Sequence, residues 1–118
     1  MNELLKSVSD DKKVAVIIVG YQLLVSAKQC QLNESDDPSI DIILEYCGFD
    51  QSPIGKMIGN IFWEHSIQTD PHLAFDMIFE FSSAEKAAVK EMLQTLVVED
   101  NTIMRQEVAN HLSIILDL

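Results

Sequence analysis

The three prolines constrain the fold most, because each follows a residue that can cap the start of a helix. The pairs are Asp37-Pro38, Ser52-Pro53 and Asp70-Pro71. In such a pair the first side chain accepts a hydrogen bond from an amide of the first turn, while proline has the right φ and no amide to leave unpaired. The pairs therefore predict three helix starts, each with the acid or the serine as N-cap.

The spacing of apolar residues agrees with these helix starts. Apolar side chains recur at intervals of three and four, as one face of a helix requires. Gly48 is placed to end the first of these helices, and Ser82-Ser83-Ala84-Glu85 fits a capping box that opens another. The predicted inward faces are Ile40, Ile43, Leu44 and Cys47; Ile54, Met57, Ile58, Ile61 and Phe62; Leu73, Met77, Ile78 and Phe81; Val89, Met92, Leu93 and Leu96; and Val108, Leu112, Ile115 and Leu116.

The run VAVIIVGYQLLV, residues 14–25, is ambiguous because its β-branched residues also suit a buried strand. Its apolar residues keep helical spacing over three turns, and the sequence has no second strand-like run to pair with it. We therefore interpret it as a helix, with Asp10 and Asp11 as candidate caps. Because it is apolar on nearly every side, we expect it to be the central helix.

We predict an all-α fold, a single compact bundle of about six helices. A chain of 118 residues can bury one core without disulfides or a structural metal. We expect one domain over the whole chain, with an ordered core at about residues 11–117 and helices at about 11–30, 38–47, 53–65, 71–81, 83–99 and 103–117.

The charge of the chain excludes some classes of partner. Eight Lys and Arg against nineteen Asp and Glu give a net charge of −11, which repels phosphate backbones and anionic lipids. The two cysteines have no CxxC spacing, and the longest apolar run is too short to cross a bilayer. We expect a cytoplasmic protein that binds a protein partner, does not bind nucleic acid and does not insert into membranes.

Two parts of the chain follow the same layout. Residues 23–49 and 93–118 each run from an apolar helix end through a polar joint to an amphipathic helix. Either the fold contains two pseudo-repeated helix pairs, or the similarity is an accidental match between helices of one bundle.

The second of these parts resembles the tellurite-resistance TerB-like family. Its joint reads Asp100-Asn101-Thr102-Ile103 with Glu107 one turn on, and residues 82–99 look like the family's penultimate helix. The resemblance covers about residues 12–118 in layout and residues 82–118 in residue detail. It implies an all-helical cytoplasmic domain linked to stress or tellurite resistance, with divalent-ion or protein binding and no established catalytic activity.

The chain departs from the family at both joints. The family usually has Asp-Gly there, whereas this chain has Asn101 in place of the glycine and Gln29-Cys30 at the first joint. Asparagine tolerates a left-handed turn, so the geometry of the second joint can survive. The departures place in doubt a metal site built from paired acidic joints.

Acidic side chains at the two joints are the candidate metal ligands. Ca²⁺ or Mg²⁺ needs several converging oxygens, although the EF-hand pattern is absent. If the pseudo-repeats pack as a pair, the two joints would share one acidic pole. The alternative is that Asp100 or Asn101 caps the last helix and the remaining acids are solvated. The candidates are Glu99, Asp100, Asn101 and Glu107 at the second joint, and Glu34, Asp36 and Asp37 at the first.

No pattern in the sequence supports catalysis. His65, His72 and His111 fall on three different predicted helices, and the sequence has no glycine-rich phosphate loop. Trp63 and Phe79 fall off the main apolar stripes, so we predict that they form an exposed patch for a protein partner, with a second copy of the chain as one option.

Two interpretations of function follow. The first is a non-catalytic TerB-like domain that acts through protein contacts, with weak Ca²⁺ or Mg²⁺ binding as an option and no other cofactor. The second is an acidic inhibitor or immunity-type protein whose charge steers it onto a basic protein partner.

Overall fold

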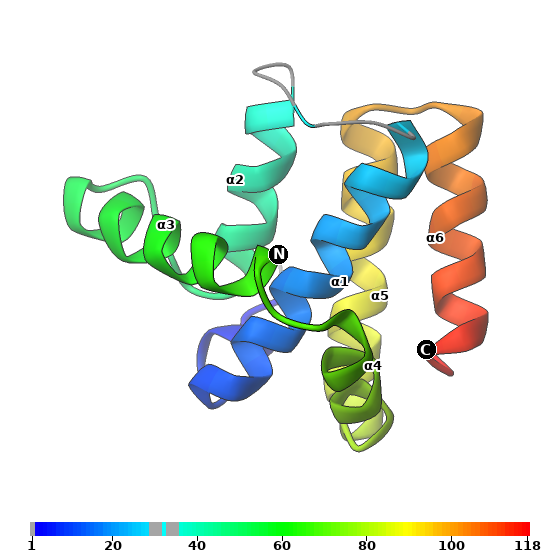
Figure 1. Ribbon diagram of the computed structural model, residues 1–118, viewed down its shortest axis with the longest axis horizontal. Helices are drawn as coiled ribbons and strands as arrows, with labels where there is room; N and C mark the ends of the chain where they lie inside the picture. Colours follow the sequence, from blue (N-terminus) through cyan, green and yellow to red (C-terminus); the bar gives the residue numbers. More distant parts are fainter. Residues whose placement is uncertain (1, 29–31, 33–35) are drawn as a thin grey trace.

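The structure is a computed structural model that describes residues 2–28, 32 and 36–118. The described residues form helices and no strands, as the sequence predicts, and these helices make one bundle (Figure 1). The predicted end of the first helix at about residue 30 lies outside the described residues. The elements are η1 (Leu4–Lys6), α1 (Asp10–Lys28), α2 (Asp37–Tyr46), α3 (Pro53–Ile67), α4 (Pro71–Phe79), α5 (Ser83–Glu99) and α6 (Ile103–Ile115).

Helix α1 is the centre of the bundle, which confirms the interpretation of the ambiguous run. Its residues 15–20, 23 and 24 are buried, and it packs against every other α-helix of the described chain. The Ser9 Oγ atom accepts a hydrogen bond from the Lys12 amide at 3.3 Å. Ser9 therefore caps this helix, and Asp10 and Asp11 lie in its first turn.

Two of the three proline-marked caps are confirmed. The side chains of Ser52 and Asp70 accept hydrogen bonds from the amides of Gly55 and His72, each at 3.0 Å. The third prediction is wrong by one residue, because Asp37 is already helical and Asp36 occupies the N-cap position of α2 without a capping hydrogen bond. The carboxylate of Asp36 faces a buried arginine instead, as described below.

Gly48 ends α2, as predicted. Its φ of 94° lies in the left-handed region that favours glycine. The Gly48 amide donates to the Glu45 carbonyl and the Phe49 amide donates to the Leu44 carbonyl, both at 3.0 Å. This pair of bonds is a Schellman motif, and it turns the chain from α2 toward α3.

Helix α3 packs with a different face from the one predicted. Ile54, Met57, Ile58 and Ile61 were expected in the core, but their side chains are 67%, 58%, 38% and 62% exposed. Of the predicted face only Phe62 packs against the core. The buried residues of the helix, Gly59 and Ser66, are small, and a Cβ atom added at Gly59 would lie 3.2 Å from the Phe49 Cβ. Small residues let α3 approach its neighbours closely, and this leaves the large apolar side chains outside.

The core also extends further toward the N-terminus than predicted. Leu5, in η1, is fully buried, and η1 packs against α5. The Asn2 amide donates to Glu91 Oε2 at 3.0 Å, and the Tyr46 hydroxyl donates to the same oxygen at 2.9 Å. Residues before the predicted limit of about 11 therefore pack on α5, where Asn2 shares the Glu91 carboxylate with Tyr46 of α2.

The capping box at the start of α5 forms as predicted and also binds α1. Ser82 Oγ accepts from the Glu85 amide at 3.1 Å, and Glu85 Oε1 accepts from the Ser82 amide at 2.9 Å. The Nζ atom of Lys12, on α1, lies 2.9 Å from Glu85 Oε2. The hydrogen bond from Lys12, followed by that from the Ser82 amide, lowers the pKa of Glu85. The carboxylate therefore stabilises the fold above the ordinary glutamate pKa, and this contribution is lost as pH falls through the lowered pKa.

We predict that Ser82→Ala lowers the free energy of unfolding by about 1 kcal/mol, because an amide of the first turn loses its acceptor. Urea denaturation followed by circular dichroism measures the change. Ser83→Ala, at the exposed neighbouring position, is the matched control and should leave the stability nearly unchanged. Equal losses for the two variants would contradict a specific capping role.

Candidate functional site

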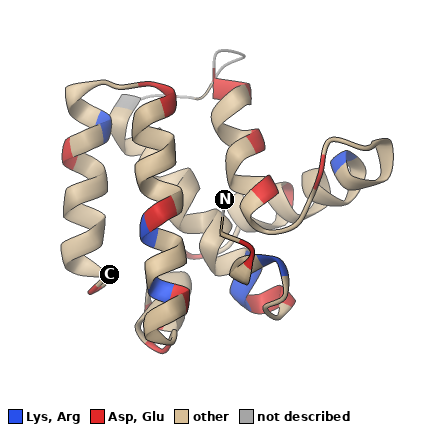
Figure 2. Cartoon of the chain, turned by 180° about the vertical axis from the view of Figure 1, so that it is seen from behind, with Lys and Arg blue, Asp and Glu red and all other residues tan. Residues whose placement is uncertain are grey.

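One acid of the first joint and two of the second meet around the side chain of Arg105, the single arginine of the chain. Arg105 projects from α6 and is 2% exposed, and Asp36 beside it is 1% exposed. Its Nη2 atom lies 3.8 Å from Asp36 Oδ1 and 3.7 Å from Asp100 Oδ2, while Nη1 lies 3.3 Å from Glu99 Oε2. Figure 2 shows the basic position on α6 beside the acidic end of α5. A guanidinium thus supplies positive charge among three carboxylates.

Neutral oxygens complete the surroundings of this guanidinium. Arg105 Nη1 donates to Ser39 Oγ at 2.9 Å and to the Leu96 carbonyl at 2.8 Å. Ser39 in turn donates to Glu99 Oε2 at 2.5 Å. Because Ser39 and Asp36 belong to the start of α2, these bonds fasten α2 to the joint between α5 and α6.

Thr102 caps α6, and neither Asp100 nor Asn101 does. The Thr102 Oγ1 atom accepts from the Arg105 amide at 3.1 Å. Asp100 is directed to the arginine, and Asn101 is exposed in the joint. At the start of this helix, the backbone amide of Arg105 therefore binds Thr102 while its side chain binds Asp100.

The other predicted metal ligands lie apart from this cluster. Glu107 is exposed two residues after Arg105, on a nearly opposite face of α6, and it borders a different hollow that contains His111. Asp37 is exposed and faces α3. Glu34 lies outside the described residues. No three His, Cys, Asp or Glu side chains in the described ranges are grouped to hold a metal ion, and metal binding stays a prediction.

The sequence contains a signal that could have identified Arg105. Val108, Ala109 and Leu112 follow it at three, four and seven residues, so Arg105 falls on the apolar face of its helix. A basic residue on an inward face needs an acidic partner. Acids precede it at both Glu99 and Asp100, where they were interpreted as metal ligands instead.

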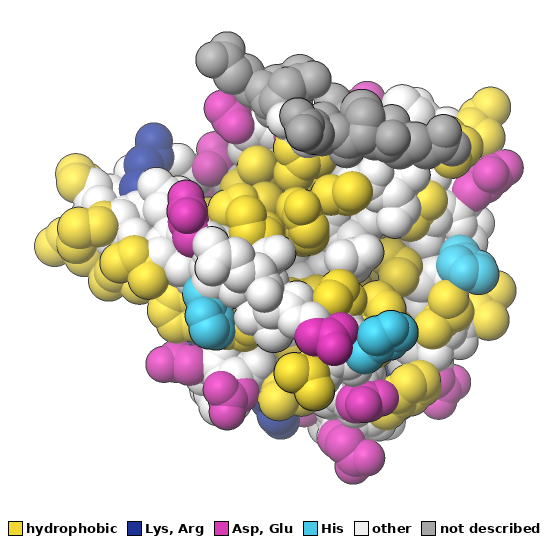
Figure 3. All heavy atoms as spheres, viewed as in Figure 1, with side chains coloured by type: hydrophobic (Ala, Val, Ile, Leu, Met, Phe, Trp, Pro, Cys, Tyr) yellow, Lys and Arg dark blue, Asp and Glu magenta, His cyan; other side chains and the backbone are white. Residues whose placement is uncertain are grey.

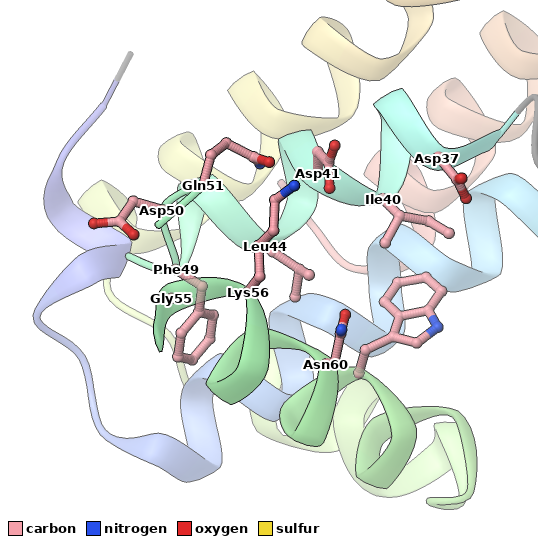
Figure 4. A pocket seen from close by; sticks show the side chains of 11 residues that line it. Asp37, Ile40, Asp41, Leu44, Phe49, Asp50, Gln51, Gly55, Lys56 and Asn60 are labelled. Carbon is pink, nitrogen blue, oxygen red and sulfur yellow. The ribbon is translucent and has the colours of Figure 1, made fainter. Parts of the chain in front are cut away.

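A groove between α2 and α3 is the second candidate site (Figure 4). Its volume of about 380 Å³ is within the range of ligand pockets. Three aspartates stand at its rim, and Lys56 extends from α3 across it. The apolar lining is Ile40, Leu44, Phe49 and Trp63, and the polar lining is Asp37, Asp41, Asp50, Gln51, Lys56 and Asn60.

Trp63 is part of this groove and is half-buried. Its ring meets the ring of Tyr21, on α1, edge-on with 5.5 Å between centroids. Phe79, predicted to share a patch with Trp63, lies at the end of α4, is 48% exposed and does not line the groove. Trp63 therefore shares its surface with residues of α2 and not with Phe79.

Asp50 is held in its charged form at the groove rim. The Ser52 hydroxyl donates to Asp50 Oδ1 at 2.5 Å and the Ser52 amide donates to the same oxygen at 3.0 Å. These two hydrogen bonds lower the pKa of Asp50. With one lysine among three aspartates, the rim attracts cations.

The histidines and the described cysteine do not form a nucleophile with its base. His65, His72 and His111 are exposed on α3, α4 and α6. Cys47 is buried, and burial raises the pKa of its thiol to about 12. Cys47 is therefore protonated at neutral pH and is not a reactive thiolate.

No family model, curated protein or solved structure matches this chain. Among the described helices, none is both long and apolar enough to span a membrane.

We predict that Arg105→Ala lowers the free energy of unfolding by about 3–5 kcal/mol, because buried Asp36 loses a charged partner. A double-mutant cycle with Asp36→Asn, measured by urea denaturation, should give a coupling of at least about 0.5 kcal/mol. Gln106→Ala, at the exposed next position, serves as the control. Additive losses for Arg105→Ala and Asp36→Asn would contradict the ion pair.

Proposed function

We propose that this chain is a non-catalytic protein-interaction domain that binds a basic segment of a partner in the groove between α2 and α3. The observation that supports this most is an apolar floor beneath three aspartates. An amphipathic segment with apolar and basic side chains would match both the apolar floor and the acidic rim of the groove. Its apolar residues would contact the floor near Trp63, and its Lys or Arg side chains would pair with the rim.

The charge of the whole chain supports the same partner. The net charge of −11 attracts a basic molecule over distances longer than a direct contact, and it speeds association at low salt. The apolar floor adds affinity that salt does not screen. A partner that uses both should bind more weakly, but still measurably, as salt is raised.

A groove that binds a basic segment is compatible with both interpretations of the sequence. The TerB-like domain acts through protein contacts, and the acidic inhibitor or immunity-type protein binds a basic partner. A role in stress or tellurite resistance rests on the resemblance of residues 82–118, and a cytoplasmic location rests on the pattern of the cysteines. Binding of Ca²⁺ or Mg²⁺ rests on the acids near Arg105. A rise in melting temperature with one of these ions, abolished by Asp100→Asn, would support it.

We predict that an amphipathic peptide of Lys and Leu binds the groove. Trp63 is the single tryptophan of the chain, so its fluorescence reports occupancy when the peptide lacks tryptophan. The emission should change saturably, and the affinity should fall as salt is raised. Asp37→Asn combined with Asp41→Asn should weaken binding about tenfold, which corresponds to about 1.4 kcal/mol.

The control removes two charges elsewhere on the surface. Asp76→Asn with Glu80→Gln changes exposed acids at α4 and makes the net charge less negative by the same amount as the groove variant. It should affect binding much less than the groove variant. The proposal fails if the two double variants bind alike, or if a peptide with Glu in place of Lys binds as tightly.

A further inference from the structure

Four large apolar side chains lie on an uncovered flank of α3. Ile54, Met57, Ile58 and Ile61 form this α3 stripe, and each is 38% exposed or more. Helix α3 projects from the bundle and packs mainly against α1 (Figure 1). Figure 3 shows hydrophobic side chains gathered along its outer edge. None of the four residues lines the groove between α2 and α3, so the groove leaves the α3 stripe unexplained.

The charge of α3 differs from that of the rest of the chain. The helix carries Lys56 and Glu64, which cancel, whereas the whole chain has a net charge of −11. In Figure 2 the helix is almost entirely free of charged positions. A second copy of the chain can therefore approach along α3 with less like-charge repulsion than along any acidic face.

Other occupants fit the α3 stripe less well. A basic partner gains little there, since the three aspartates that would attract it line the groove instead. Helices that lie on membranes usually carry many Lys and Arg beside their apolar face. Helix α3 has a single lysine, and the acidic chain is repelled by anionic lipids.

We propose that the α3 stripe is the interface of a homodimer, in which the α3 helices of two copies pack side by side and antiparallel. A two-fold interface requires a surface that is complementary to itself. With the axis between Met57 and Ile58, Ile54 of one copy lies opposite Ile61 of the other. Met57 of each copy then lies opposite Ile58 of the other copy, beside the axis. The sequence of the stripe is thus compatible with this symmetry.

This inference does not rest on the proposed function. The groove lining includes Lys56, Asn60 and Trp63 of α3, which belong to another flank of the helix than Ile54 and Ile61. A dimer built on the α3 stripe leaves both grooves open. Loss of the dimer and loss of peptide binding are therefore separate outcomes.

Sedimentation equilibrium over a range of protein concentrations tests the dimer. We expect the natural chain to dimerise reversibly, and Ile54→Asp with Ile61→Asp to weaken dimerisation at least about 100-fold, because four carboxylates then face one another. Ile103→Asp with Ile114→Asp is the control. These isoleucines of α6 are 77% and 80% exposed, so the control should dimerise like the natural chain.

A charge exchange identifies the surface directly. The Ile54→Lys, Ile61→Lys variant should be monomeric alone and should form a heterodimer when mixed with the Ile54→Asp, Ile61→Asp variant. Circular dichroism checks that every variant keeps its helices. A natural chain that stays monomeric at its highest soluble concentration overturns the proposal. A dimer that survives the aspartates, or a stripe that binds neutral lipid vesicles as a monomer, also overturns it.

Discussion

The buried guanidinium of Arg105 is the interaction on which the arrangement of the helices depends. Burying this charge is favourable only with charged and hydrogen-bonding partners around it. Those partners come from α2, from the end of α5 and from the joint before α6. Three of the acids that suggested a metal site in the sequence, Asp36, Glu99 and Asp100, therefore meet in space around a side chain of the protein itself.

Local chemistry explains which parts of the fold the sequence predicts well. The caps at Ser52, Asp70 and Ser82 involve atoms within three residues of each other, so their patterns can be recognised without the fold. The start of α2 was predicted one residue late because the carboxylate of Asp36 pairs with Arg105 and does not cap the helix. That partner is far along the sequence and overrides the local capping rule.

The side of α3 that is buried could not be predicted from the spacing of its apolar residues. Large apolar residues at helical spacing usually mark the buried side, yet Gly59 and Ser66 are buried here and the isoleucines are outside. The groove was missed for a related reason. Its aspartates and Trp63 come from two helices and the turn between them, so their proximity depends on the angle that the Gly48 turn sets.

The bonds of Arg105 also bear on the order in which the molecule folds. Its acceptor at Leu96 is nine residues away, whereas its acceptor at Ser39 is 66 residues away. Contacts that are close in sequence cost less chain entropy to form. The hairpin of α5 and α6 can therefore assemble first, with α2 docking onto it later. Since α2 is one wall of the groove, the groove would be among the last parts of the molecule to form.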